Sequence, residues 1–148
     1  MDAKRAFAER LGRLFSDLGL PRTAGLVLGY LVVADEEPVA LSDLARELGL
    51  SKASASLATR LLERYRAIER VHRPGDRRAY YRLAEDAWRR VIEQDLAFVR
   101  ELAGIAEQAA AAPSGPGARG RLAELARVYR RYGEKLKELL EEEWPASP

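Results

Sequence analysis

The sequence predicts a mainly α-helical protein that contains one small β-hairpin. Apolar residues recur at helical spacing along most of the 148 residues, strand-like alternation is confined to residues 67–83, and Gly and Pro separate the segments. The length is sufficient for one domain with a substantial core. We therefore expect a single domain over residues 1–148, with an N-terminal helix (1–19), a central region of helices and hairpin (20–84) and C-terminal helices (85–148).

The first two helices are predicted from apolar stripes and helix breakers. Residues 2–18 form an amphipathic helix that ends at Gly19. A second helix, with proline in its first turn, covers about residues 21–33. In this helix Gly25 and Gly29 lie one turn apart and leave a smooth patch, which we expect to serve close packing within the chain rather than between chains.

The residues that follow have the spacing of two short helices joined by a tight turn. The first carries Leu44 and Leu48 on one side, and Gly49 then supplies the left-handed backbone that ends a helix at little cost. Ser51 caps the second helix with its hydroxyl. This spacing predicts a helix-turn-helix.

The second of these helices has a cationic face opposite its core side. At 100° per residue, Lys52, Ser56 and Arg60 lie opposite the core-facing Ala58, and no acidic residue precedes Glu63. Small residues let a helix enter the major groove of DNA, where Lys, Arg and Ser bind phosphates and base edges. An ordinary solvated face is the alternative interpretation of the pattern alone.

A β-hairpin is predicted directly after this helix. Residues 67–83 contain two alternating segments around a turn rich in breakers and arginine, and residues 39–40 are expected to pair with them as a short edge strand. A hairpin in this position is the wing of a winged helix, and Arg77 or Arg78 can enter the adjacent minor groove. We expect Asp76 to pair with a wing arginine and hold the hairpin rigid.

The charge distribution indicates a surface that binds a polyanion. Residues 51–82 contain nine Lys and Arg but three carboxylates, a net charge of +6, whereas the whole chain carries +2 and the remainder therefore −4. We predict that twelve residues form this surface, the first ten contacting DNA and the last two shaping the wing: Ser51, Lys52, Ala53, Ser54, Ser56, Thr59, Arg60, Arg73, Arg77 and Arg78, with Gly75 and Asp76.

Two long helices are predicted beyond the hairpin. They cover residues 86–112 and about 119–143, separated by the breaker-rich loop 113–117, and the last carries a seam that resembles a coiled coil. These two helices and the N-terminal helix carry more apolar surface than the compact helix-turn-helix region can bury, so we expect them to form a homodimer. Two heads about 34 Å apart would bind a palindrome together. The alternative is that the stripes only close the core of one monomer.

Three segments carry motifs that recur in one known family. They are residues 19–25 (GLPRTAG), residues 50–56 (LSKASAS) and the hairpin turn at 74–81 (PGDRRAYY). In these segments the chain resembles the MarR-type winged-helix transcription regulators, and more closely their GbsR-like branch. The resemblance covers roughly residues 5–84 and implies the winged-helix fold and DNA binding, whereas it does not identify a ligand.

We therefore expect a homodimeric transcription regulator that binds double-stranded DNA at a palindromic operator. Repression is the commoner outcome in the resembled family, by analogy. Two alternatives stay open: a non-specific architectural DNA-binding protein, and a winged helix used for contact with another protein. The cationic face argues against the second alternative.

A small-molecule effector is a further expected partner. The resembled family often places an effector pocket between the head and the dimerisation helices, and a cationic effector would need an aromatic cage. The candidates for such a cage are Tyr30, Trp88, Phe98, Tyr129 and Tyr132. Packing in the core explains the same aromatic residues without a ligand.

Catalysis, metals and cofactors are not indicated. The single histidine, His72, lies on the hairpin, has no carboxylate at metal-ligand spacing, and the chain contains no cysteine. Glycines at 115–117 lack the lysine of a phosphate-binding loop. The longest uncharged apolar run, residues 24–34, is too short to span a bilayer, so we expect a soluble, cytoplasmic protein without a membrane partner.

Overall fold

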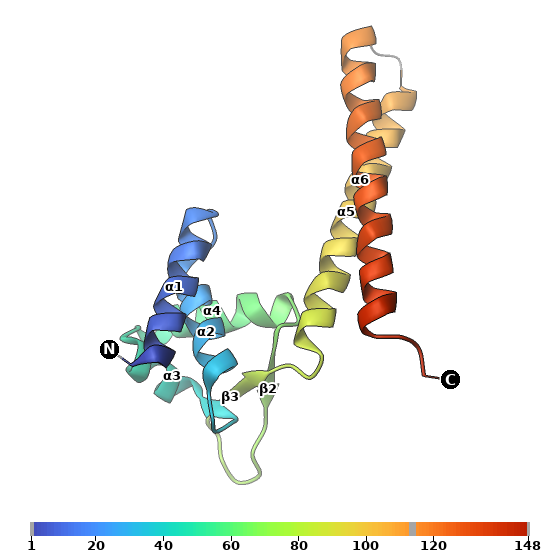
Figure 1. Ribbon diagram of the computed structural model, residues 1–148. Helices are drawn as coiled ribbons and strands as arrows, with labels where there is room; N and C mark the ends of the chain where they lie inside the picture. The colour runs from blue at the N-terminus through green and yellow to red at the C-terminus, as the bar shows by residue number, and fades with distance from the viewer. Residues whose placement is uncertain (1, 113–114, 148) are drawn as a thin grey trace. The chain divides into compact units, whose positions relative to one another are not determined.

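The computed structural model describes residues 2–112 and 115–147. The predicted class is confirmed, since helices dominate and one small sheet is present (Figure 1). The chain divides into two compact units, Met1–Ala87 and Trp88–Pro148. The elements in chain order are α1 (Ala3–Asp17), α2 (Arg22–Val33), β1 (Val39–Ala40), α3 (Leu41–Leu48), α4 (Lys52–Arg64), β2 (Ile68–Val71), β3 (Tyr80–Leu83), α5 (Ala87–Ala111) and α6 (Pro116–Glu143).

Glycines allow α1 and α2 to pack closely in the first unit. A Cβ atom added to Gly25 would lie 2.7 Å from the Cα of Gly12, and one added to Gly29 would lie 2.7 Å from the Cα of Ala8. No side chain fits at such distances from a backbone, so both positions require glycine. The prediction that this glycine pair serves packing within the chain is confirmed.

The predicted helix-turn-helix is also confirmed. α3 ends at Gly49, whose φ of 65° is left-handed, and the backbone N–H of Leu50 donates to the carbonyl of Ala45 at 2.8 Å. α4 begins after Ser51, whose hydroxyl accepts a hydrogen bond from the backbone N–H of Ser54 at 3.0 Å. The turn and the cap together fix the N-terminal end of α4.

The core of the first unit lies where α2, α3 and α4 meet. Leu26 and Val27 of α2 and Leu44 of α3 are completely or almost completely buried. α4 contributes the small side chains of Ala55 and Ala58, which are buried as well. Because these side chains are small, α4 packs close to the core, and its opposite side forms part of the surface.

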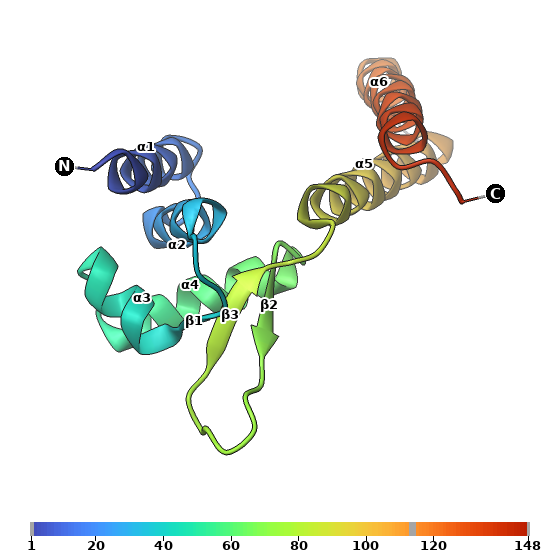
Figure 2. The same ribbon diagram turned by 60° about the horizontal axis from the view of Figure 1, so that its bottom comes forward.

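A three-stranded antiparallel sheet carries the hairpin. Its strand order is β1-β3-β2, with Val39 opposite Tyr81 and Ile68 opposite Leu83. The edge strand expected at residues 39–40 is therefore present as β1. The hairpin strands are shorter than predicted, and the loop that joins β2 to β3 extends away from the helices of the first unit (Figure 2).

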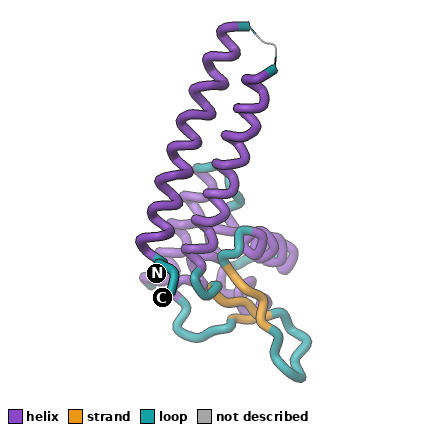
Figure 3. Tube along the Cα trace, turned by 90° about the vertical axis from the view of Figure 1, so that its right-hand side faces the viewer, coloured by secondary structure: helices purple, strands orange, loops and turns teal. Residues whose placement is uncertain are grey.

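The second unit consists of α5 and α6, which lie side by side and antiparallel (Figure 3). A Cβ atom added to Gly133 of α6 would lie at ordinary van der Waals distance from the side chains of Leu96 and Val99 of α5, so the two helices are close here. The guanidinium of Arg130 donates to the carboxylate of Glu107 from Nε at 2.6 Å and from Nη2 at 3.1 Å. One buried contact and one surface ion pair thus fix the register of the two helices.

The start of α6 differs from the prediction. The sequence suggested a loop over residues 113–117, but α6 begins at Pro116. Proline suits the first turn of a helix because the N–H that it lacks would have no partner there. Residues 113 and 114 of the predicted loop lie outside the described residues. Over the described ranges, no helix combines the length and apolar character that a membrane span requires.

Candidate nucleic-acid interface

The cationic face of α4 lies at the surface of the first unit. Lys52, Ala53 and Arg60 are exposed and Ser56 is half-buried, whereas Ala58 on the opposite side is 2% exposed. Arg60 Nε donates a long hydrogen bond of 3.4 Å to the carbonyl of Ser56, so its guanidinium follows the helix surface. Two cations and a hydroxyl therefore share one solvent-facing side of a helix.

Ser51 and Ser54, both predicted to contact DNA, also stabilise the start of α4. The hydroxyl of Ser51 accepts from the backbone of Ser54 and donates to the Ser54 hydroxyl at 2.9 Å. Ser51 is exposed and Ser54 is half-buried. Their mutual hydrogen bonds hold the first turn, whose free N–H groups and partial positive charge suit an anionic partner such as phosphate.

The structure corrects the placement of Thr59. The helical projection put it beside the cationic face, but its side chain is 0% exposed and its hydroxyl donates to the carbonyl of Ser56 at 2.9 Å. α4 packs against both α2 and α3, so more of its circumference is buried than if it contacted one helix. Thr59 is a core residue with a satisfied hydroxyl and does not form part of the exposed face.

An exposed leucine on α4 was not anticipated from the sequence. Leu57 is 61% exposed and, with Arg60 and Arg64, lines a surface cavity of about 410 Å³ between α4 and the start of α2. Leu57 and Thr59 lie at the same 100° from Ala58 on opposite sides, so a helical projection does not tell which of the two is exposed. The cationic face of α4 therefore has an apolar border.

The turn of the wing is organised by Gly75 and Asp76, as predicted. Gly75 has a φ of 77°, which favours glycine, and the N–H of Asp76 donates to the carbonyl of Arg73 at 3.1 Å. The Asp76 carboxylate accepts from the backbone N–H of Arg78 at 2.9 Å and from Nη2 of the same residue at 3.0 Å. The expected pairing of Asp76 with a wing arginine is confirmed.

Tyr80 completes this network and was not singled out from the sequence. The residue is 4% exposed, and its hydroxyl donates to Oδ2 of Asp76 at 2.6 Å. The guanidinium of Arg73 lies over the ring at 4.4 Å from its centroid, and that of Arg78 lies at 5.3 Å. One ring therefore positions two of the arginines predicted to contact DNA, while Arg77 is exposed in the loop.

These hydrogen bonds have an electrostatic consequence for Asp76. The side chain of Arg78, the hydroxyl of Tyr80 and the backbone of Arg78 hold the pKa of the Asp76 carboxyl far below its usual range. The hydrogen bond between Tyr80 and Asp76 also raises the pKa of the Tyr80 hydroxyl. Asp76 is therefore ionised at neutral pH and acts as a fixed acceptor at the base of the wing.

The five aromatic residues proposed for an effector cage are distributed over both units. Tyr30 is half-buried in the first unit, where it lines a cavity. Trp88, Phe98 and Tyr132 of the second unit are about half or more exposed, and the rings of Tyr129 and Tyr132 meet edge to face at 6.2 Å between centroids. In the second unit the structure thus brings two of the candidates into contact.

Metal-ligating side chains do not cluster in the part of the chain that the structure describes. No group of three or more His, Asp or Glu residues there has a geometry that could hold a metal ion. His72 is exposed in the loop after β2.

Comparison with known proteins agrees with this geometry. The MarR family matches residues 18–79, which contain the helix-turn-helix and most of the wing. A solved structure described as a transcriptional regulator is 31% identical, has a TM-score of 0.80, and is matched over 95% of this chain and 97% of its own. The likeness to that structure therefore includes both units.

Two curated relatives are similar over shorter stretches. The HTH-type transcriptional regulator MmpR5 of Mycobacterium tuberculosis is 35% identical over 68% of this chain, and the putative HTH-type transcriptional regulator YvaV of Bacillus subtilis is 29% identical over 61%. The matches span 61% and 50% of the lengths of these relatives. All the relatives described here are transcriptional regulators rather than enzymes. The chain belongs to the MarR family of winged-helix transcription regulators.

Proposed function

We propose that the protein is a sequence-specific DNA-binding repressor that acts as a homodimer on a palindromic operator. The observation that carries the proposal is the exposed cationic face of α4 next to an arginine-rich wing whose side chains are held in place by Tyr80 and Asp76. Family membership supports the same role. The motifs of the turn before α2, of α4 and of the wing further support a place in the GbsR-like branch.

In this proposal α4 enters the major groove. Lys52 and Arg60 bind phosphates or guanine edges, Ser56 binds a phosphate or base, and Ala53 allows close approach because it is small. Leu57, exposed at the border of the face, contacts a thymine methyl group. The helix therefore contributes both base-specific and phosphate contacts.

The wing contributes contacts in the adjacent minor groove or to its phosphates. Arg73, Arg77 and Arg78 are all exposed. Arginine favours narrow, electronegative minor grooves, and a guanidinium already held over an aromatic ring loses less conformational entropy on binding. The wing thereby adds affinity and sensitivity to groove width.

Exposed apolar side chains support the homodimer. Phe7 and Leu14 of α1, and Leu18 directly after it, are 40–68% exposed, and α1 lines a surface cavity of about 610 Å³. α5 and α6 of the second unit expose further large apolar residues: Phe98, Ile105, Val128, Tyr132 and Leu139. Apolar surface on this scale is typical of an interface, and a second copy of the chain is the partner that a palindromic site requires.

Selection from a pool of random duplexes tests the function directly. The purified protein is expected to enrich one palindromic motif with half-sites one helical turn apart. Retention of DNA without enrichment of a motif would instead indicate an architectural binder. If no duplex is retained at moderate salt, DNA binding itself is wrong and the cationic face serves another partner.

A further inference from the structure

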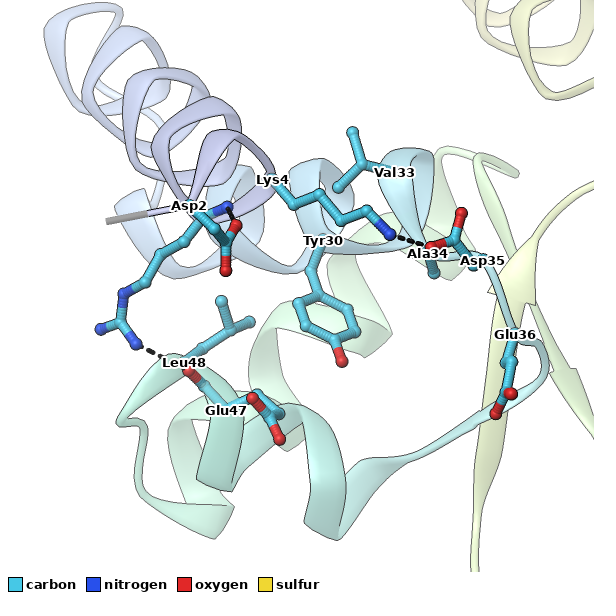
Figure 4. A pocket seen from close by; sticks show the side chains of 10 residues that line it. Asp2, Lys4, Tyr30, Val33, Ala34, Asp35, Glu36, Glu47 and Leu48 are labelled. Carbon is cyan, nitrogen blue, oxygen red and sulfur yellow. Dashed lines mark hydrogen bonds and ion pairs between the residues drawn. The ribbon is translucent and has the colours of Figure 1, made fainter.

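A cavity of about 290 Å³ opens in the first unit away from the cationic face of α4 (Figure 4). Its walls come from the start of α1, the end of α2 with the turn after it, and the end of α3. Tyr30, Val33 and Leu48 give it an aromatic and apolar lining. The volume is at the lower end of the range for ligand sites, so it suits a small molecule.

Negative charge exceeds positive charge around this cavity. Among the described residues, four carboxylates and two cations line it: Asp2, Asp35, Glu36 and Glu47, against Lys4 and Arg5. The excess carboxylate charge favours a cationic ligand and disfavours an anionic one.

Four of these charged groups already have structural partners inside the protein. The carboxylate of Asp2 accepts from the N–H of Arg5 at 2.8 Å and caps α1. The guanidinium of Arg5 donates to the backbone carbonyl of Glu47 at 3.2 Å. The ammonium of Lys4 forms an ion pair with Asp35. The carboxylate of Glu47 forms a longer ion pair, at 3.7 Å, with the exposed Arg46. Glu36 and Glu47 are both exposed, and they are the acids that a ligand can reach.

Tyr30 separates these two carboxylates. Figure 4 shows its ring between Glu47 of α3 on one side and Asp35 and Glu36 on the other. Burial raises the pKa of the Tyr30 hydroxyl, and the negative charges of Glu47 and Asp43 raise it further. The face of an aromatic ring attracts ammonium groups. The cavity therefore has two acidic ends and an aromatic centre.

We propose that this cavity binds a small aliphatic diamine. One ammonium group binds at Glu47, the other binds at Glu36 beside Asp35, and the methylene chain lies against Tyr30 and the apolar wall. Ammonium groups that carry N–H donors suit carboxylate acceptors at both ends. Lys4 acts as an internal competitor, because its own ammonium group already binds Asp35.

The cavity also shares residues with the helix-turn-helix. Glu47 and Leu48 are the last two residues of α3, which is the first helix of that motif. A ligand that joins the turn after α2 to the end of α3 would alter the freedom of α3 relative to α2. Diamine binding itself does not depend on the proposed DNA binding.

Calorimetric titration of the full chain with 1,4-diaminobutane tests the site, with butylamine and 1-butanol as comparison ligands at constant ionic strength. We expect one diamine per chain and an affinity that decreases from diamine to monoamine to alcohol. Equal affinity for monoamine and diamine would contradict the two acidic ends. Absence of saturable binding at millimolar diamine would overturn the proposal.

Substitutions with opposite expected effects identify the site. Replacing both acids in one chain, Glu36→Gln with Glu47→Gln, should weaken diamine binding by about tenfold, since two partly exposed ion pairs are lost. Lys4→Met should strengthen binding severalfold because the competing ammonium is removed. Glu142→Gln, an exposed acid of α6, is the matched control and should have no effect.

The remaining outcomes separate this proposal from the proposed function. If Lys4→Met leaves the affinity unchanged, or if the control weakens it as much as the double substitution, the diamine binds elsewhere and the proposal is wrong. DNA affinity measured without amine tests the proposed function by itself. A chain that binds DNA but no diamine, or diamine but no DNA, therefore shows which of the two proposals has failed.

Discussion

Tyr80 connects a strand of the sheet to the arginines of the wing. Its ring is buried and lies under the guanidinium of Arg73, while its hydroxyl donates to Asp76, which in turn binds Arg78. A side chain with these contacts holds Arg73 and Arg78, two of the arginines proposed to contact DNA, in place before any DNA binds. We regard Tyr80 as a positioning residue, since it is largely shielded from any partner.

Substitution of Tyr80 separates the role of its ring from that of its hydroxyl. Tyr80→Phe keeps the ring under Arg73 and should reduce DNA affinity severalfold, because Asp76 and Arg78 lose a fixed partner. Tyr80→Leu should reduce it further. The measurements are DNA affinity and hydrogen exchange at the amides of the wing. Weaker DNA binding with unchanged exchange would contradict a positioning role.

Asp76 should make the wing insensitive to pH in the physiological range. Its pKa is lower in the folded state than in the unfolded chain, so ionised Asp76 stabilises the fold fully above about pH 5, where the unfolded carboxyl is also ionised. This contribution is lost as the pH falls from there through the lowered pKa. Urea unfolding of the parent protein and of Asp76→Asn measures the free energy of unfolding of each. The difference between the two values should be constant from pH 8 to 5 and should shrink below pH 4. A difference that changes between pH 8 and 6 would show that another group controls the wing.

At the scale of elements, the close contact between α1 and α2 depends on glycines, which have no Cβ atom. Gly29→Ala should lower the free energy of unfolding by about 1–3 kcal/mol, because its Cβ would overlap the backbone of Ala8. Gly120→Ala in α6 is a matched control, since among the described residues no atom outside the nearby backbone of α6 lies within 4 Å of the added Cβ. That change should stabilise the helix by about 0.5–1 kcal/mol. Urea unfolding of both variants measures the two effects, and equal changes would contradict the packing argument.

Elements were more predictable from the sequence than the side chains that complete the site. The helix-turn-helix follows from local signals, namely the cap at Ser51 and the left-handed Gly49, so its bounds were close to those observed. The burial of Thr59 depends on which helices flank α4, which a helical projection of one segment does not contain. The position of Tyr80 under Arg73 depends on the path of the hairpin loop, which alternation along a strand does not determine.

At the scale of the whole molecule, the proposed homodimer depends on exposed apolar side chains. Leu14 of α1 is 52% exposed, and Leu57 of α4 is 61% exposed. Leu14→Lys should shift the protein towards monomers in sedimentation, because a charge would be buried in the interface. Leu57→Lys serves as the control and should leave the dimer intact. If both variants sediment as the parent does, α1 does not form the interface.

Salt dependence of DNA binding tests the central claim most directly, since the claim is that a cationic helix and an arginine-rich wing contact phosphates. The affinity of the parent protein for its selected operator should fall with a log–log slope of about −7, as expected for a dimer that neutralises ~8 phosphates. The joint variant Lys52→Ala with Arg78→Ala should have a clearly shallower slope. A parent slope near zero, or a slope that these substitutions leave unchanged, would contradict the assignment of this surface to DNA.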